Sequence, residues 1–369
     1  MLPPDRHDVH VAIDGFHLWG SSRDRGIGTY VRGMLAALAA RNDVEVSVTV
    51  VGDVEVPAGV RAVPVTPRRA GPLGFIEHAR RSGEELAALG ADVAHVPGLP
   101  PPARSSLPTA VTVHDLFPLT LRWTANARER NLLRLSLPLL RRAEAIVVPS
   151  AHTASELRGR GFDPARLHVV PNAVDPAFGP TGPVEASDRP YLLMVAGPDP
   201  RKRRELALDV IAGTVAAGHP HRLVLVGRQT DEQEASLRAV VAARGLTDHV
   251  EVAGHVDDLA AWYRGAAVVL VTSAGEGFGY PAVEAMACGA PVVALANSAT
   301  TEIVGDAGML VGDDDVAALT RATIDLLVDD ASRARLVAAG QQRAQAYALD
   351  TFGQGLVDCW AALVARSSR

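Results

Sequence analysis

Residues 268–295 read VVLVTSAGEGFGYPAVEAMACGAPVVAL and carry the strongest fold signal in the chain. The aliphatic run Val268–Val271 is typical of a buried strand, and Pro281–Cys288 is predicted to form a helix. Gly289 suits the left-handed position that follows a helix, and a further strand is expected at Pro291–Ala294. A buried strand, a short helix and another buried strand indicate a parallel sheet flanked by helices.

The same alternation continues on both sides of this stretch and indicates two domains, because 369 residues are too many for one ordinary core. It weakens between Asp175 and Pro190, where prolines and glycines interrupt the pattern. We therefore expect an α/β protein with two doubly wound, Rossmann-like parallel sheets that face each other across a cleft. The expected domains are residues 1–178 and 190–350, with a C-terminal helix over 351–369 that could pack back on the first domain.

Composition and charge disfavour several classes of protein. The net charge is −6 and the pI is near 6.1, whereas a nucleic-acid-binding protein is usually basic. The two cysteines, Cys288 and Cys359, cannot build a disulfide framework and favour the reducing cytoplasm. No apolar run reaches the length of about 18 residues that a membrane span needs. Residues 1–10 are polar and lack the apolar segment of a signal peptide.

The loop before the predicted helix of the opening stretch suits a bound diphosphate. Its glycines let the backbone approach a ligand closely, and the helix N-terminus presents free N–H groups to an anion. Glu276 precedes the helix and Glu284 lies one turn inside it. Each carboxylate could accept hydrogen bonds from sugar or ribose hydroxyls. The residues alone leave open a plain connecting turn with two solvated glutamates.

A second candidate follows the predicted strand Tyr191–Val195. Arg201 and Lys202 are adjacent cations near the start of a helix, where they could neutralise a departing diphosphate. The alternative is a basic, solvated helix start, because Arg203 and Arg204 extend the run.

These motifs together resemble one family. Glu276 and Glu284, with seven residues between them, resemble the paired glutamates of retaining GT-B glycosyltransferases of family 4. Pro200-Arg201-Lys202 is similar to the form found in mannosyltransferase-like members, although the common Gly-Arg form earlier in that loop is absent. Shorter matches cover most of the remaining chain, namely Arg25–Tyr30, Val113–Asp115, Val148–Ser150, Val170–Asp175, Ala287–Val293 and Thr301–Gly308.

The resemblance implies a role for each matched residue. Glu276 would hold hydroxyls of the transferred sugar, Glu284 would hold the ribose, and Arg201 and Lys202 would hold the donor phosphates. His114 would contact the sugar near the reacting carbon. On the residues alone, a histidine that follows an apolar strand can also be structural, and Asp115 could orient the imidazole. The remaining donor-binding positions are Gly28 in the first half of the chain and, in the second half, the consecutive residues Gly277, Phe278, Gly279 and Tyr280.

The implied activity is transfer of a hexose from a nucleotide-diphosphate sugar to an acceptor hydroxyl, with retention at the anomeric carbon and without a cofactor or metal. The form of the Arg201-Lys202 motif favours a GDP-mannose-like donor, and a UDP-sugar is the second candidate. A glycan, a lipid-linked molecule or a small molecule could be the acceptor. The acidic run Asp313-Asp314-Asp315 is interpreted as a solvated turn and not as a metal site. Alternatives are a nucleotide-sugar epimerase or sugar-phosphate synthase on the same fold, and a non-catalytic nucleotide-sugar-binding protein.

A basic helix is predicted over residues 125–142, with five arginines among many leucines. Such a helix could dock on an anionic membrane surface at the inner face of the membrane. We favour the simpler interpretation, a core-packed helix with a basic outer face.

Overall fold

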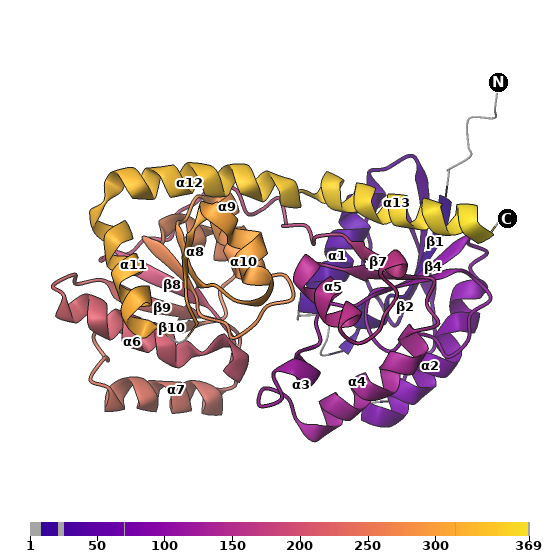
Figure 1. Ribbon diagram of the computed structural model, residues 1–369, viewed down its shortest axis with the longest axis horizontal. Helices are drawn as coiled ribbons and strands as arrows, with labels where there is room; N and C mark the ends of the chain where they lie inside the picture. Colours follow the sequence, from indigo (N-terminus) through magenta and orange to yellow (C-terminus); the bar gives the residue numbers. More distant parts are fainter. Residues whose placement is uncertain (1–8, 21–25, 70, 314, 368–369) are drawn as a thin grey trace. The chain divides into compact units, whose positions relative to one another are not determined.

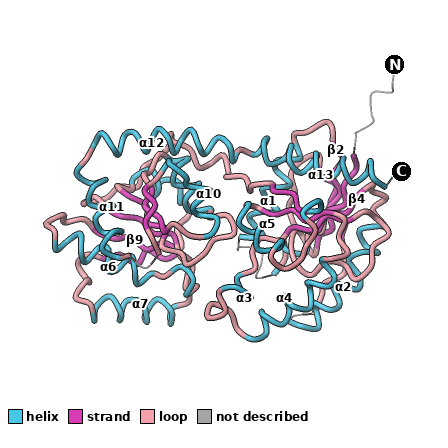
Figure 2. Tube along the Cα trace, viewed as in Figure 1, coloured by secondary structure: helices cyan, strands magenta, loops and turns pink. Residues whose placement is uncertain are grey.

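The computed structural model describes residues 9–20, 26–69, 71–313 and 315–367. The chain divides into two compact units, one formed by Met1–Ala173 with Leu349–Arg369 and the other by Val174–Ala348. We call them the first and the second unit. Figure 2 shows strands gathered inside each unit and helices around them. None of the described helices is both long and apolar enough to cross a bilayer.

The first unit contains a seven-stranded parallel sheet (Figure 1). In sheet order its strands are β3 (Val60–Pro64), β2 (Val44–Val50), β1 (Val9–Ile13), β4 (Val93–Val96), β5 (Thr109–Thr112), β6 (Ala145–Val148) and β7 (Leu167–Val169). The strand order reverses direction between β1 and β4. Ligands of such sheets bind at the carboxyl ends of the strands beside this reversal. Asp14 and His114 follow β1 and β5 at that edge.

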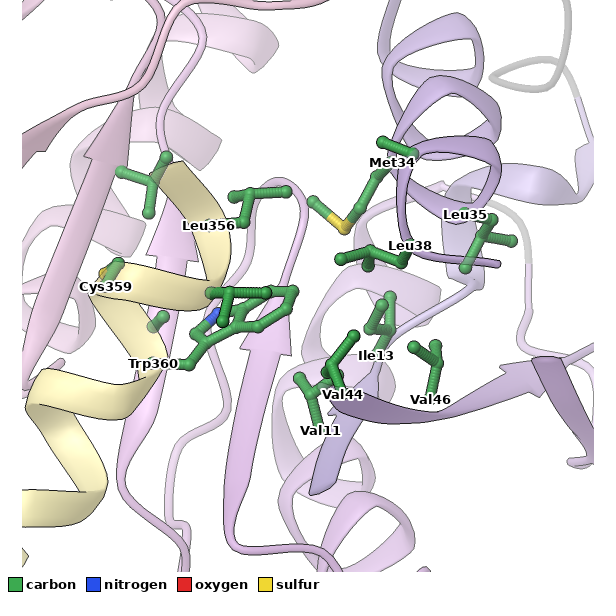
Figure 3. Close-up of a cluster of buried hydrophobic side chains, with 14 of the residues drawn as sticks. Val11, Ile13, Met34, Leu35, Leu38, Val44, Val46, Leu356, Cys359 and Trp360 are labelled. Carbon is green, nitrogen blue, oxygen red and sulfur yellow. The ribbon is translucent and has the colours of Figure 1, made fainter. Parts of the chain in front are cut away.

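Helices cover both faces of the first sheet. They are α1 (Gly26–Ala39), α2 (Gly71–Ala87), α3 (Phe117–Thr120), α4 (Ala127–Leu140), α5 (Ala151–Arg158) and α13 (Leu349–Ser367), with short 3-10 helices at Phe16–Leu18 and Pro164–Arg166. Side chains of α1 and α13 share one core cluster with alternate residues of β1, while α2, α4 and α5 supply the cluster on the other face. Figure 3 shows Leu356 and Trp360 of α13 directed toward Met34 and Leu38 of α1. Burying apolar side chains of this size contributes on the order of 2–3 kcal/mol each.

The second unit contains a six-stranded parallel sheet. In sheet order its strands are β10 (Val250–Gly254), β9 (Arg222–Val226), β8 (Tyr191–Val195), β11 (Val268–Val271), β12 (Val292–Leu295) and β13 (Met309–Val311). Its helices are α6 (Arg204–Ala216), α7 (Asp231–Ala243), α8 (Leu259–Gly265), α9 (Tyr280–Cys288), α10 (Ser298–Val304), α11 (Val316–Val328) and α12 (Asp330–Ala344), with 3-10 helices at Pro200–Lys202, Gly305–Ala307 and Gln345–Tyr347. Here the strand order reverses between β8 and β11. The loops that follow these two strands therefore meet at one edge of the sheet.

The two parallel sheets confirm the expected α/β fold class. Helix α4 lies within the basic helix expected over residues 125–142. Besides the short 3-10 helices, the strand β3 and the α-helices α3 and α10 were not predicted. Strand β3 lies at the sheet edge, and each of its residues is partly or fully exposed. Helices α3 and α10 span only 4 and 7 residues, too few to show a helical period.

Candidate functional site

Glu276 lies in the loop between β11 and α9 and is 6% exposed. Local backbone geometry sets up this loop, because Gly279 adopts the left-handed conformation (φ 101°) directly before α9. A second left-handed glycine, Gly289 (φ 80°), ends the helix, as the sequence predicts. Helix α9 thus begins at Tyr280, four residues after Glu276.

Arg201 and Lys202 reach Glu276 from the loop after β8. They lie in a short 3-10 helix, which Asp199 caps by accepting a hydrogen bond from the Arg201 N–H at 2.9 Å. The Lys202 ammonium donates to Oε1 of Glu276 at 2.7 Å, and Nη1 of Arg201 donates to Oε2 at 3.0 Å. Three of the four charged groups singled out in the sequence, Arg201, Lys202 and Glu276, therefore form one cluster in the second unit.

The loops that carry this cluster are tied together through their backbones. The Thr272 hydroxyl donates to the Lys202 carbonyl oxygen at 2.8 Å. The Ser298 hydroxyl accepts a hydrogen bond from the Glu276 N–H, also at 2.8 Å. Ser298 has a left-handed backbone (φ 46°), which is uncommon for a residue other than glycine. Neither residue could be identified from the sequence, because Thr272 precedes the glycine-rich loop and Ser298 begins α10, a helix that was not predicted.

The two cations determine the charge of Glu276. Burial alone would raise the pKa of this carboxyl, but Lys202 and Arg201 outweigh it and hold the pKa at about 2. Glu276 is therefore ionised at neutral pH, with its charge directed at Lys202 and Arg201.

Glu284 lies in a different environment on α9. Its Oε2 accepts a hydrogen bond from the Tyr263 hydroxyl at 2.9 Å, and the residue is 9% exposed. Burial raises the pKa of Glu284 to about 7, although Tyr263 and Lys202 both act to lower it. The carboxyl is thus balanced between its neutral and ionised forms near neutral pH, unlike Glu276.

The side chain of Phe278 supports the loop from inside. It is buried and packs edge-on against Tyr280 and Tyr347, with ring centroids 5.2 and 5.4 Å apart. A buried ring of this kind fixes the loop, so a ligand would meet the backbone of Gly277, Phe278 and Gly279.

His114 follows β5 in the first unit. Its Nε2 lies 2.7 Å from the carbonyl oxygen of Pro97, which can only accept, so Nε2 carries the proton. Burial lowers the pKa of His114 to about 4, against the effect of that hydrogen bond, and the imidazole is neutral at neutral pH. The Pro97 carbonyl thus holds the imidazole at Nε2, while Asp115, expected to orient it, accepts from the Phe117 N–H at 3.1 Å. Nδ1 of His114 is the ring nitrogen with an acceptor lone pair.

Gly28 is buried in the first turn of α1. The glycine-rich segment expected at 25–30 begins at Arg25, which lies outside the described residues, as does Asp314 of the acidic run.

The described carboxylates of the acidic run have structural partners. Asp313 pairs with Arg203 at 2.8 Å, and Asp315 caps α11 by accepting from the Ala318 N–H at 2.8 Å. Across the described ranges, no group of three or more His, Cys, Asp or Glu side chains is placed to hold a metal ion.

Helix α4 buries Leu133, Ser136 and Leu140 and exposes Arg128 and Arg134. This pattern matches a core-packed helix with a basic outer face, although Leu135 is also exposed.

Comparison with known proteins places both units in one family. A family model described as Glycosyltransferase Family 4 matches residues 25–178, and one described as Glycosyl transferases group 1 matches residues 189–329. The chain is 35% identical over 245 residues to the D-inositol 3-phosphate glycosyltransferase of Xylanimonas cellulosilytica, covering 59% of this chain and 57% of that protein. It is 39% identical over 154 residues to the phosphatidyl-myo-inositol mannosyltransferase of Mycobacterium leprae, covering 40% of each. The chain thus spans about half the length of these curated relatives.

A solved structure shows the same fold. Sucrose-phosphate synthase from Thermosynechococcus elongatus matches with a TM-score of 0.79 and 23% identity, covering 97% of this chain and 99% of that one. With each unit matched by a model of the same enzyme group, the chain belongs to the group 1, family 4 glycosyltransferases and has the GT-B fold.

Proposed function

We propose that the protein transfers a hexose from a nucleotide-diphosphate sugar to an acceptor hydroxyl, with retention of anomeric configuration and without a metal. The observation that carries this proposal is the cluster of Lys202, Arg201 and Glu276 next to the N-terminus of α9. Two cations and a helix N-terminus are the groups that stabilise a diphosphate, both when bound and as it departs.

Donor binding exchanges one anion for another at this cluster. Without donor, the Glu276 carboxylate pairs with both Lys202 and Arg201, and Arg201 also pairs with Asp199 at 3.1 Å. A diphosphate offers more negative charge than one carboxylate, so it draws the Lys202 ammonium toward its own oxygens. Glu276 is then available to accept hydrogen bonds from hydroxyls of the transferred sugar.

Glu284 binds the ribose of the donor. In its ionised form the carboxylate accepts hydrogen bonds from two neighbouring hydroxyls, which favours loss of the proton that burial retains near pH 7. The Tyr263 hydroxyl, which already donates to Oε2, holds the carboxylate in place.

His114 contacts a hydroxyl of the transferred sugar near the reacting carbon. The proton on Nε2 is engaged by Pro97, so the lone pair of Nδ1 accepts from that hydroxyl. A neutral imidazole in this place orients the sugar and does not compete with the cations for the diphosphate.

Transfer proceeds at one face of the sugar. The bond from the anomeric carbon to the phosphate oxygen breaks while the acceptor oxygen bonds to that carbon. The acceptor proton passes to the departing phosphate. Lys202, Arg201 and the N-terminus of α9 stabilise the charge that develops on the leaving group. Glu276 holds sugar hydroxyls and is not assigned as a covalent nucleophile.

The donor is a GDP-mannose-like or UDP-linked hexose, and the acceptor is a glycan, a lipid-linked molecule or a small molecule. Relatives named as mannosyltransferase and inositol-phosphate glycosyltransferase support a hexose donor. We interpret α4 as a core-packed helix. The alternative is that this helix contacts the inner membrane face through its exposed residues Arg128, Arg134 and Leu135.

A panel of nucleotide sugars tests the proposal. One diphosphate sugar is expected to raise the melting temperature and to yield product with an acceptor from a panel of glycans, lipids and small polyols. Isomerised donor without transfer would identify an epimerase. Binding without turnover of any acceptor would identify a nucleotide-sugar-binding protein.

A further inference from the structure

Four buried side chains of the first unit form a continuous chain of hydrogen bonds. The indole Nε1 of Trp360 in α13 lies 2.9 Å from Nδ1 of His95 in β4. Nε2 of His95 lies 2.8 Å from the Thr112 hydroxyl in β5, which lies 2.9 Å from the Tyr30 hydroxyl in α1. All four residues are at most 1% exposed. These hydrogen bonds therefore run from α13, through the neighbouring strands β4 and β5, to α1.

The direction of these hydrogen bonds follows from their chemistry. An indole N–H only donates, so Nδ1 of His95 must accept, and the single proton of the neutral ring lies on Nε2. Burial lowers the pKa of His95 to about 3, which keeps the ring neutral. Nε2 then donates to the Thr112 oxygen. Trp360 thus selects one of the two tautomers of His95.

The far end of the chain meets the candidate site. The Tyr30 ring packs edge-on against His114, with ring centroids 4.7 Å apart and planes at 82°. The hydrogen bond to Thr112 fixes the hydroxyl end of Tyr30, and Pro97 fixes Nε2 of His114. The His114 imidazole is therefore held by the hydrogen bond to Pro97 and by the Tyr30 ring. The position of the Tyr30 ring depends in turn on its hydrogen bond to Thr112.

A polar chain in this position is unusual, because its surroundings are aliphatic. Val11, Val93 and Ala110 belong to the same core cluster as Trp360 and Tyr30. Buried polar groups are costly unless every member is paired, whereas a fully paired network specifies one arrangement of the elements that it joins. Apolar side chains would fill the space without fixing the orientation of Tyr30.

We propose that Trp360 and His95 are positioning residues for His114. Through Thr112 they set the place of the Tyr30 ring, and this ring sets the orientation in which His114 offers Nδ1 to the sugar. The inference rests on the role proposed for His114, and it makes α13 part of the machinery for transfer and not only a packing helix.

The test compares Trp360→Phe, which removes the N–H and keeps an aromatic ring, with Leu363→Ala, which removes buried volume from the same helix. Imidazole ¹⁵N spectra report the tautomers of His95 and His114 in each protein. In Trp360→Phe we expect His95 to lose its single tautomer and the His114 resonances to shift. In Leu363→Ala the melting temperature falls, while both histidine patterns stay as in the wild type.

Kinetics supply a second readout. We expect Trp360→Phe to lower kcat between about 10- and 100-fold, as a misplaced contact does, with nucleoside-diphosphate affinity unchanged because Lys202 and Glu284 belong to the second unit. Tyr30→Phe breaks the same chain at its other end and is expected to behave alike. Unchanged His114 resonances in both variants, or a kcat loss no larger than in Leu363→Ala, would overturn the proposal. The spectra need no turnover, so they decide the matter even if the proposed transferase activity fails.

Discussion

The Lys202 ammonium lies 2.7 Å from Oε1 of Glu276, and the two residues are 74 positions apart in the chain. This ion pair joins the loop after β8 to the loop after β11, which are neighbouring strands of the second sheet. It means that the cation expected to bind phosphate already has an anionic partner in the same site. Donor binding therefore requires Lys202 to exchange the Glu276 carboxylate for a phosphate oxygen, because Lys202 is already paired.

Lys202→Ala is expected to abolish the rise in melting temperature that a nucleotide-diphosphate sugar causes, because Lys202 supplies a charge-assisted contact to the phosphate. The measurement is a thermal shift with and without donor, each variant being compared with its own ligand-free state. Arg333→Ala is the matched control, since Arg333 is a half-exposed cation of the second unit that pairs only with Asp330 among the ion pairs described. A full donor-dependent shift in Lys202→Ala would remove Lys202 from the binding site.

Glu276→Gln is expected to separate nucleotide binding from transfer. Removing the carboxylate frees Lys202 from its competing anion and leaves Arg201 paired with Asp199, so nucleoside diphosphate should bind at least as tightly as in the wild type. The transfer rate should fall by about 100-fold or more, because a neutral amide holds sugar hydroxyls less well. Isothermal titration and a transfer assay measure the two quantities, and transfer at the wild-type rate would contradict the assigned role.

The same substitution should also change stability in acid. The pKa of Glu276 falls from its ordinary value of 4.5 to about 2 in the folded protein, which corresponds to roughly 3 kcal/mol. A lowered carboxyl pKa stabilises the fold above pH 4.5, and this stabilisation is lost as the pH falls toward 2. Urea unfolding of wild type and Glu276→Gln between pH 6 and pH 3 should show the smaller acid dependence in the variant. Parallel curves would argue against a strongly paired Glu276.

The contribution of Glu284 to stability should depend on pH in the opposite direction. Its pKa is raised to about 7, so the folded state holds the proton more tightly than the unfolded state. This contribution to stability is fully present below pH 4.5 and is lost as the pH rises through about 7. Binding of the ribose hydroxyls to the carboxylate should then release this proton at pH 6.

Calorimetry in buffers of different ionisation enthalpy measures the proton released on binding nucleoside diphosphate. We expect a greater release in the wild type than in Glu284→Gln, because the amide has no proton to lose. The comparison subtracts any proton that the diphosphate itself gives up. Equal release in the two proteins would place the ribose away from Glu284.

Much of the second sheet could be predicted from sequence, because its central strands β8, β9, β11 and β12 are almost wholly buried and appear as aliphatic runs. The limits of β8 and β11 are those expected from such runs. Strand β3 could not be identified in this way, since an edge strand with exposed residues and a terminal Pro64 lacks the signal.

The site was predictable only as separate motifs. Glycines, a proline and two glutamates indicate a loop and a helix N-terminus, and adjacent cations indicate a phosphate site. That Arg201, Lys202 and Glu276 form one cluster depends on β8 lying beside β11, which is a property of the topology. The left-handed backbone of Ser298 has no sequence signal, because serine rarely adopts it. The pair of His95 and Trp360 spans 265 positions, and each residue alone resembles an ordinary core residue.

A crystal structure with a bound nucleotide-diphosphate sugar tests the central claim most directly. We expect the diphosphate at the N-terminus of α9, the Lys202 ammonium moved from Glu276 to a phosphate oxygen, and the ribose hydroxyls on Glu284. A donor bound elsewhere, with Lys202 still paired to Glu276 and Glu284 still bound only by Tyr263, would contradict the account.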